Sequence, residues 1–271
     1  MVSEALRSIS SNGVESVLHN PEQYGQTSHT VISTGPSKHN RSIPERWIAS
    51  QYVLDVMCRQ ALNHQLMEIK RIYYTLRDDS QMATAAGMFF EYRVHRLLCE
   101  GRTINIYPVL CKSKKRRKPK GEEFFVYNDY SARNTGEPEQ LILSEFDTKI
   151  VSKGEVKNIR KNTYYRPTEK NFPSVDSWLL LEPTPRHPVL LKFQITLNKT
   201  EHVILKTGLD IVDKLAPLAK ERYLVVVTEE GLCPKIPVPA SCLGGGSRPD
   251  GYFKVYHLTF SRDELFPPLV I

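Results

Sequence analysis

Apolar residues recur at helical spacing in the first part of the chain. After Ser42-Ile-Pro-Glu45, which has the form of a helix start, the apolar positions predict a helix over 44–77 that breaks near Asn63. A second helical pattern covers 81–100 and stops at Gly101, because glycine accepts the backbone conformation that ends a helix. The first hundred residues are therefore predicted to be mainly helical.

Beyond Gly101 the pattern changes to short apolar runs that are typical of strands. We expect strands at 104–110, 124–127, two within 139–152, 174–181, 188–197, 223–228 and 255–259. Polar loops are expected at 161–171 and 237–246, and a helix at 199–220. This order predicts an α/β fold, in which helices flank a mixed sheet.

These patterns divide the chain into three parts. Residues 1–42 are rich in Ser, Asn, Thr and Gly and are expected to form a poorly ordered tail. Residues 43–78 form a helical extension, and residues 79–271 form the main domain.

Composition limits the cellular compartment and the kind of partner that we expect. The chain has 271 residues, a net charge of +7 and a pI of about 9.1, which favours polyanions as partners. It has no apolar run long enough for a membrane span, and its start does not have the form of a secretory signal. The five cysteines are scattered, so reduced thiols in the nucleus or cytoplasm are expected, with secretion into a host left open.

Three oxygen-bearing side chains are candidates for a metal site. Glu91 lies in the second helix, Asp176 stands at the entry of an apolar strand, and Gln194 lies within the next strand. Mg²⁺ prefers oxygen ligands and leaves room for water and phosphate, and Mn²⁺ is an alternative. The other interpretation is a solvated glutamate, a turn aspartate and a glutamine that makes only structural hydrogen bonds.

Lysines near these residues are candidates for stabilising charge on a phosphate. Strand alternation places Lys192 on the same face as Gln194 and Thr196. Lys199 and Lys206 are rivals, because a lysine in the next helix is long enough to reach the site. His202 shares a helix face with Lys206 and is a further phosphate contact or a structural histidine.

A basic run at 112–120 fits a nuclear localisation signal or a nucleic-acid surface, or else a solvated hairpin loop. Aromatic and basic residues before Asp176 could contact nucleic acid or pack their own loop. The candidate nucleic-acid contacts are Lys114, Lys115, Arg116, Arg117, Tyr165, Arg166, His202 and Lys206.

Four phrases, in this order, carry a resemblance to a known family. They are GMFFEYRVH (87–95), YYRP followed by FPSVDS (164–177), LLKFQIT (190–196) and EHVILKTGL (201–209). With them the chain resembles the restriction-endonuclease-like domain of Crinkler and retrotransposon-hot-spot effectors, within the PD-(D/E)xK superfamily. The resemblance covers about residues 80–266.

The resemblance implies a restriction-endonuclease-like mixed sheet and magnesium-dependent cleavage of DNA. It assigns metal binding to Glu91 and Asp176 and places Gln194 where an acidic residue is usual. Thr196 stands where lysine usually follows, so Lys192 or Lys199 would have to replace it. An inactive nuclease fold that binds DNA or protein is the alternative.

In such effectors a P-loop NTPase module commonly precedes this domain. The chain has no Walker A sequence. Residues 43–78 are therefore interpreted as a remnant of that upstream module.

Overall fold

The computed structural model describes residues 32–36, 44–48, 53, 70, 73–74, 76–77, 83–117, 122–135, 137–152, 159–168, 172–182, 188–217, 219–242 and 253–266. The chain divides into two compact units. The first comprises Met1–Arg93 with Arg262–Ile271, and the second comprises Val94–Ser261.

The first unit begins with a two-stranded ribbon where a helix start was predicted. Strands β1 (Ile32–Pro36) and β2 (Pro44–Ile48) pair antiparallel. Pro44 has no N–H group, which suits the first residue of a strand as well as the first turn of a helix. The predicted helix over 44–77 is therefore wrong at its start. Its helical part is seen at Val53, Lys70, Tyr73, Tyr74, Leu76 and Arg77, and its other residues lie outside the described part. The predicted tail likewise lies outside it, apart from β1.

Within the first unit, aromatic side chains near residue 73 contact its last described segment, which contains α9 (Arg262–Leu265). The rings of Tyr73 and Phe266 lie 5.3 Å apart between centroids, and the guanidinium of Arg262 lies 5.0 Å from the ring centroid of Tyr74. Arg93 Nε donates a hydrogen bond of 2.6 Å to the carbonyl oxygen of Leu265.

Helix α6 (Ala83–Cys99) confirms the second predicted helix, and the division between the two units falls within it. Its end is set by Gly101, whose φ of +68° is the left-handed conformation expected of a residue that stops a helix.

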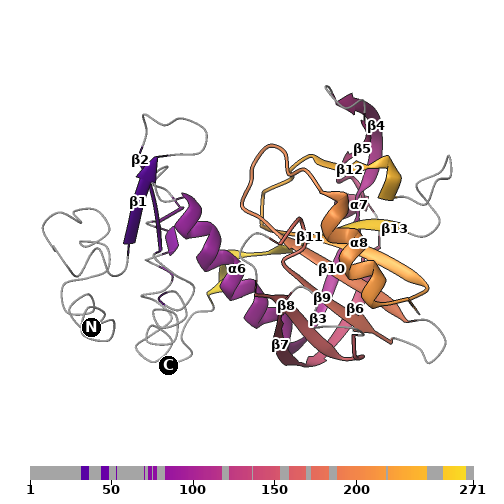
Figure 1. Ribbon diagram of the computed structural model, residues 1–271, viewed down its shortest axis with the longest axis horizontal. Helices are drawn as coiled ribbons and strands as arrows, with labels where there is room; N and C mark the ends of the chain where they lie inside the picture. Colours follow the sequence, from indigo (N-terminus) through magenta and orange to yellow (C-terminus); the bar gives the residue numbers. More distant parts are fainter. Residues whose placement is uncertain are drawn as a thin grey trace, which may run out of the picture. The chain divides into compact units, whose positions relative to one another are not determined.

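An eight-stranded sheet is the centre of the second unit. Its order is β6-β3-β13-β11-β10-β9-β8-β7, and β10, β11 and β13 run parallel to one another. The strands are β3 (Glu100–Pro108), β6 (Glu139–Glu145), β7 (Asp147–Val151), β8 (Thr163–Pro167), β9 (Ser177–Leu181), β10 (Val189–Ile195), β11 (Glu221–Glu229) and β13 (Phe253–Phe260). Helix α8 (Lys206–Leu215) forms the crossover from β10 to β11 (Figure 1).

The sheet is curled, because its two outer strands are neighbours in the sequence. Only Phe146 separates β6 from β7, so the edges of the sheet approach each other at that residue. The N–H of Phe146 donates to the carbonyl oxygen of Cys99 at the end of α6, at 3.3 Å.

Strands β9, β10 and β11 are buried almost throughout, which explains their continuous apolar sequences. On one face, α8 packs against the sheet through Leu209 and Val212, which belong to the same buried cluster as Leu190 and Val226. Tyr164, Phe193 and His95 lie on the other face, where the ring of Tyr164 contacts both of the others.

A second sheet of three strands has the order β12-β5-β4. Its strands are β4 (Leu110–Arg117), β5 (Glu122–Asp129) and β12 (Ile236–Pro239). The short helices α7 (Ala132–Thr135) and η3 (Ala240–Cys242) complete the described elements.

Three of the loops expected from the sequence are wrong. Basic residues 112–117 belong to strand β4 rather than to a loop, strand β8 occupies the predicted loop at 161–171, and β12 and η3 occupy the start of the predicted loop at 237–246. Helix α8 is also shorter than 199–220, because backbone N–H groups before it bond other segments. His202 N donates to Lys235 O and Ile204 N donates to Pro237 O, so this stretch is not helical.

The α/β class predicted from the sequence is confirmed, with more sheet than helix. Among the described residues, no helix combines the length and the apolar character that a membrane crossing requires.

Candidate functional site

Asp176 and Gln194 meet across the β9–β10 pair. Ser177 pairs with Phe193, so Asp176, one residue earlier, lies beside Gln194 on the neighbouring strand. Asp176 Oδ2 accepts hydrogen bonds from Gln194 Nε2 at 2.7 Å and from the backbone N–H of Ile195 at 2.6 Å. The two side chains that the sequence singled out are therefore in direct contact.

The loop before Asp176 is held in place by the start of α8. Ser174 has a φ of 53°, and its Oγ accepts a hydrogen bond from Leu205 N at 2.7 Å. Gly208 in the first turn of α8 lies against this loop so closely that a Cβ atom there would be 1.5 Å from Pro173 O. Only glycine permits this approach, and the approach positions Asp176.

The amide of Gln194 is satisfied on one side only. Its nitrogen bonds Asp176, whereas its Oε1 is buried and has no hydrogen-bond partner in the described part of the chain. A buried unpaired acceptor costs about 1–3 kcal/mol, so an additional group that satisfies it would stabilise the site.

A second buried chain of hydrogen bonds reaches the residue next to Asp176 from the opposite face of the sheet. His95 Nδ1 lies 2.7 Å from Tyr164 Oη, and Tyr164 Oη lies 2.6 Å from Ser177 Oγ. Burial raises the pKa of the Tyr164 hydroxyl well above its usual value, more than the Ser177 hydrogen bond lowers it. The neutral tyrosine therefore links α6 to the first residue of β9.

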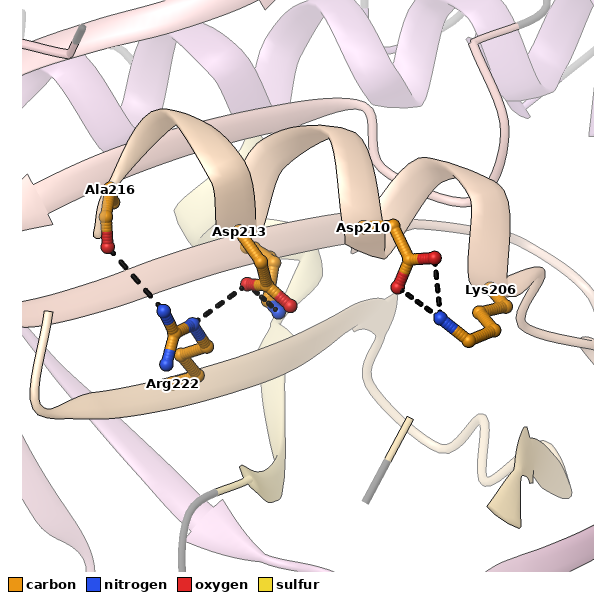
Figure 2. Close-up of polar contacts among 6 residues, drawn as sticks. Lys206, Asp210, Asp213, Ala216 and Arg222 are labelled. Carbon is orange, nitrogen blue, oxygen red and sulfur yellow. Dashed lines mark hydrogen bonds and ion pairs between the residues drawn. The ribbon is translucent and has the colours of Figure 1, made fainter. Parts of the chain in front are cut away.

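Lys192 is placed beneath α8 and bound to an acid. Its Nζ is 2.7 Å from Asp213 Oδ1, and the same oxygen lies 3.1 Å from Arg222 Nε. Figure 2 shows Asp213 on α8 directed at Arg222, whose guanidinium also reaches the carbonyl oxygen of Ala216. Burial lowers the pKa of Lys192, and Asp213 opposes this effect. The ammonium group thus holds α8 on the sheet.

The other two lysine candidates lie between β10 and the start of α8. Lys199 is exposed in the loop that follows β10. Lys206 bonds both carboxylate oxygens of Asp210, one turn along the same helix (Figure 2). This hydrogen bond raises the pKa of Lys206. Burial lowers the pKa of the neighbouring His202, which makes it a weaker candidate for a cationic phosphate contact.

Glu91 is half-buried in the part of α6 that belongs to the first unit, whereas Asp176 and Gln194 belong to the second. The structure thus brings together two of the three predicted metal ligands within one unit. Among the described residues, no group of three or more His, Cys, Asp and Glu side chains is arranged to hold a metal ion.

The candidate nucleic-acid contacts lie in different surroundings, on strand β4, on strand β8 and in the core. Lys114, Lys115, Arg116 and Arg117 follow one another along β4, where they pair with Phe125, Phe124, Glu123 and Glu122. Arg166 is half-buried on β8. Tyr165 is 1% exposed and stacks on Trp178 with an angle of 5° between the rings. Its predicted stacking on a base is therefore corrected, because the ring is part of the core.

Sequence reasoning missed the hydrogen-bonded set of His95, Tyr164 and Ser177. The only signal was proximity, since His95 follows Glu91 by four residues and Ser177 follows Asp176. It also missed Asp213 as the partner of Lys192, because pairing across a crossover helix leaves no local pattern.

Comparisons with protein-family models, with curated proteins and with solved structures find no match for the chain.

Proposed function

We propose that the chain is a magnesium-dependent DNA endonuclease with a restriction-endonuclease-like fold, similar to the nuclease domains of Crinkler effectors. The element order supports this fold. Helix α6 precedes three successive antiparallel strands, β8, β9 and β10, and α8 then crosses over to β11, which lies parallel to β10. Asp176 directly precedes the second of these strands, and Gln194 lies near the end of the third.

The observation that carries the proposal is the contact between Asp176 and Gln194. Their facing atoms lie 2.7 Å apart, and the remaining amide oxygen is buried with no partner among the described residues. Rotation of the amide by half a turn would direct Oε1 toward Asp176. It would give two oxygens at about the separation of adjacent ligands around Mg²⁺, roughly 3 Å. Mg²⁺ is commonly held by one or two protein oxygens plus waters and phosphate, so this donor set fits.

The chemistry expected from such an ion is Lewis-acid activation of the phosphodiester and of the attacking water. Asp176 supplies the anionic ligand, and Gln194 supplies the neutral one. The backbone N–H of Ile195 fixes the carboxylate in one orientation. Lys199 is the lysine we assign to charge on the phosphate, because it is exposed after β10 while Lys192 is bound to Asp213.

Binding of DNA without cleavage is the second candidate. Specific observations favour it: two donors of the chain itself occupy Asp176 Oδ2, and Asp213 engages the ammonium of Lys192. A neutral glutamine also lowers the negative charge available for a cation.

Supercoiled plasmid incubated with the protein and Mg²⁺ or Mn²⁺ separates the two candidates. The nuclease proposal expects nicked and linear products with the wild type, loss of cleavage with Asp176→Asn, and retained or increased cleavage with Gln194→Glu. The matched control is Asp147→Asn, an exposed aspartate on β7. Plasmid that is bound but intact with both metals would favour the second candidate, as would equal cleavage by wild type and Asp176→Asn.

A further inference from the structure

A partly buried arginine, Arg133, lies near the carboxyl end of strand β13. Arg133 Nη2 donates a hydrogen bond of 2.9 Å to Thr259 Oγ1 near the end of β13. Within the described part of the chain, no carboxylate forms an ion pair with its guanidinium. Arginine has five N–H donors, so most of its hydrogen-bonding capacity remains for a ligand.

The groups around Arg133 do not neutralise it. Thr228 Oγ1 and His257 Nε2 share a hydrogen bond of 2.8 Å, and the same hydroxyl lies within hydrogen-bond distance of the carbonyl oxygens of Glu229 and Leu232. Burial, and then the charge of Arg133, lowers the pKa of His257 to about 3, so the ring stays neutral near pH 7. The ring of Tyr130 covers His257 at 4.8 Å between centroids.

Arg133 lies at the same end of the strands as Asp176 and Gln194. Thr259 lies near the carboxyl end of β13, and Gln194 lies near the carboxyl end of the parallel strand β10. Asp176 directly precedes β9, which is antiparallel to β10, so Asp176 lies at the same end of the strands as Gln194. Three strand spacings separate β9 from β13, a span of about 14 Å.

Two exposed lysines add positive charge at the carboxyl ends of the parallel strands. Lys199 follows β10, and Lys235 follows β11. Glu201, Glu229 and Glu230 lie at the same ends of these strands, so this end of the sheet has mixed charge. We call Arg133, Lys199 and Lys235 the carboxyl-end rim.

We propose that the carboxyl-end rim binds the phosphate backbone of a nucleic-acid strand, with Arg133 holding a phosphate away from Asp176. This proposal rests on the proposed function for the identity of the polyanion. A guanidinium forms two parallel hydrogen bonds to a phosphate, and the bond from Thr259 fixes its direction. The rim orients the strand, and the Asp176–Gln194 pair acts on it.

The test is binding of a fluorescein-labelled DNA duplex, followed by anisotropy over a range of salt concentrations in EDTA, where cleavage does not interfere. Arg133→Gln removes the anchor. Arg160→Gln is the control, because Arg160 is exposed and lies at the other end of the strands. It precedes β8, and its neighbour Lys161 pairs with Leu180 near the end of β9. Arg133→Lys keeps the charge but loses the two parallel N–H donors of the guanidinium. A thermal melt of each variant reports whether it is folded.

The proposal expects about tenfold weaker binding for Arg133→Gln, with a slope of log K against log salt that is smaller by about one. Arg133→Lys should keep the wild-type slope with an intermediate affinity, and Arg160→Gln should match the wild type. If folded Arg133→Gln binds like Arg160→Gln, or if the wild type does not bind DNA, the anchor is overturned. The two proposals can fail separately. If Arg133→Gln binds DNA more weakly while the wild type leaves plasmid intact with Mg²⁺, the role of Arg133 is supported and only the nuclease proposal is contradicted.

Discussion

Replacing Gly208 with alanine should destabilise the second unit through a single added methyl group. The new Cβ would lie 1.5 Å from Pro173 O and 2.7 Å from Pro173 C, whereas real contacts of a Cβ are essentially never shorter than 3.0 Å. Relief of the overlap requires the helix or the loop to move by at least about 1.5 Å. Both are fixed, since Ser174 bonds Leu205 and Lys192 bonds Asp213.

The net magnitude follows from two opposing effects. Overpacking of this kind costs about 1–3 kcal/mol or more, and alanine recovers about 0.5–1 kcal/mol over glycine within a helix. We therefore expect Gly208→Ala to lose about 2 kcal/mol of unfolding free energy. Because Pro173 is three residues before Asp176, the proposed DNA cleavage should also fall.

Urea denaturation followed by circular dichroism measures this loss. Thr207→Ala, at the exposed neighbouring position of α8, should be neutral or slightly stabilising. Gly87→Ala in α6 meets no atom within 4 Å and should gain about 0.5–1 kcal/mol. A Gly208→Ala protein as stable as Thr207→Ala, with the same dependence on urea, would refute the close approach of α8 to the Pro173 loop.

Two further predictions concern buried polar groups. Tyr164→Phe leaves His95 and Ser177 without their shared partner and should cost about 3 kcal/mol in urea denaturation, against about 1 kcal/mol for Ser177→Ala; equal losses would argue against the chain of hydrogen bonds. His257 has its pKa lowered from 6.5 to about 3, so the unfolded chain binds more protons between these values and stability should fall as the pH is lowered through this range. His257→Gln should lose this contribution, which is at most about 1.4 kcal/mol per pH unit, and an unchanged slope of unfolding free energy against pH would contradict a buried neutral histidine.

Much of the second unit was predictable because its strands are buried on both faces. Continuous apolar runs at 174–181, 188–197 and 223–228 mark β9, β10 and β11, and the crossover helix between the last two follows from the change of period. Strand β8 was missed because its tyrosines and Arg166 resemble a polar loop; Tyr164 and Tyr165 are in fact core residues. The strand at 44–48 was missed because Ser-Ile-Pro-Glu satisfies a helix start equally well.

The candidate site was predictable only in part. Adjacent strands place Asp176 beside Gln194, and strand alternation places Lys192 on the face of Gln194, as expected. Alternation does not give the partner of a side chain, and Asp213, 21 residues later, bonds Lys192. Arg133 and Thr259 are 126 residues apart, so their contact depends on the fold alone.

The central claim is that Asp176 and Gln194 together hold a divalent cation. Electron paramagnetic resonance of Mn²⁺ titrated with protein tests it most directly, since the signal of the free aqueous ion decreases as the ion is bound. The account predicts binding by the wild type, tighter binding by Gln194→Glu and loss of binding by Asp176→Asn. Equal Mn²⁺ binding by the wild type and Asp176→Asn, or none by the wild type and Gln194→Glu, would contradict it.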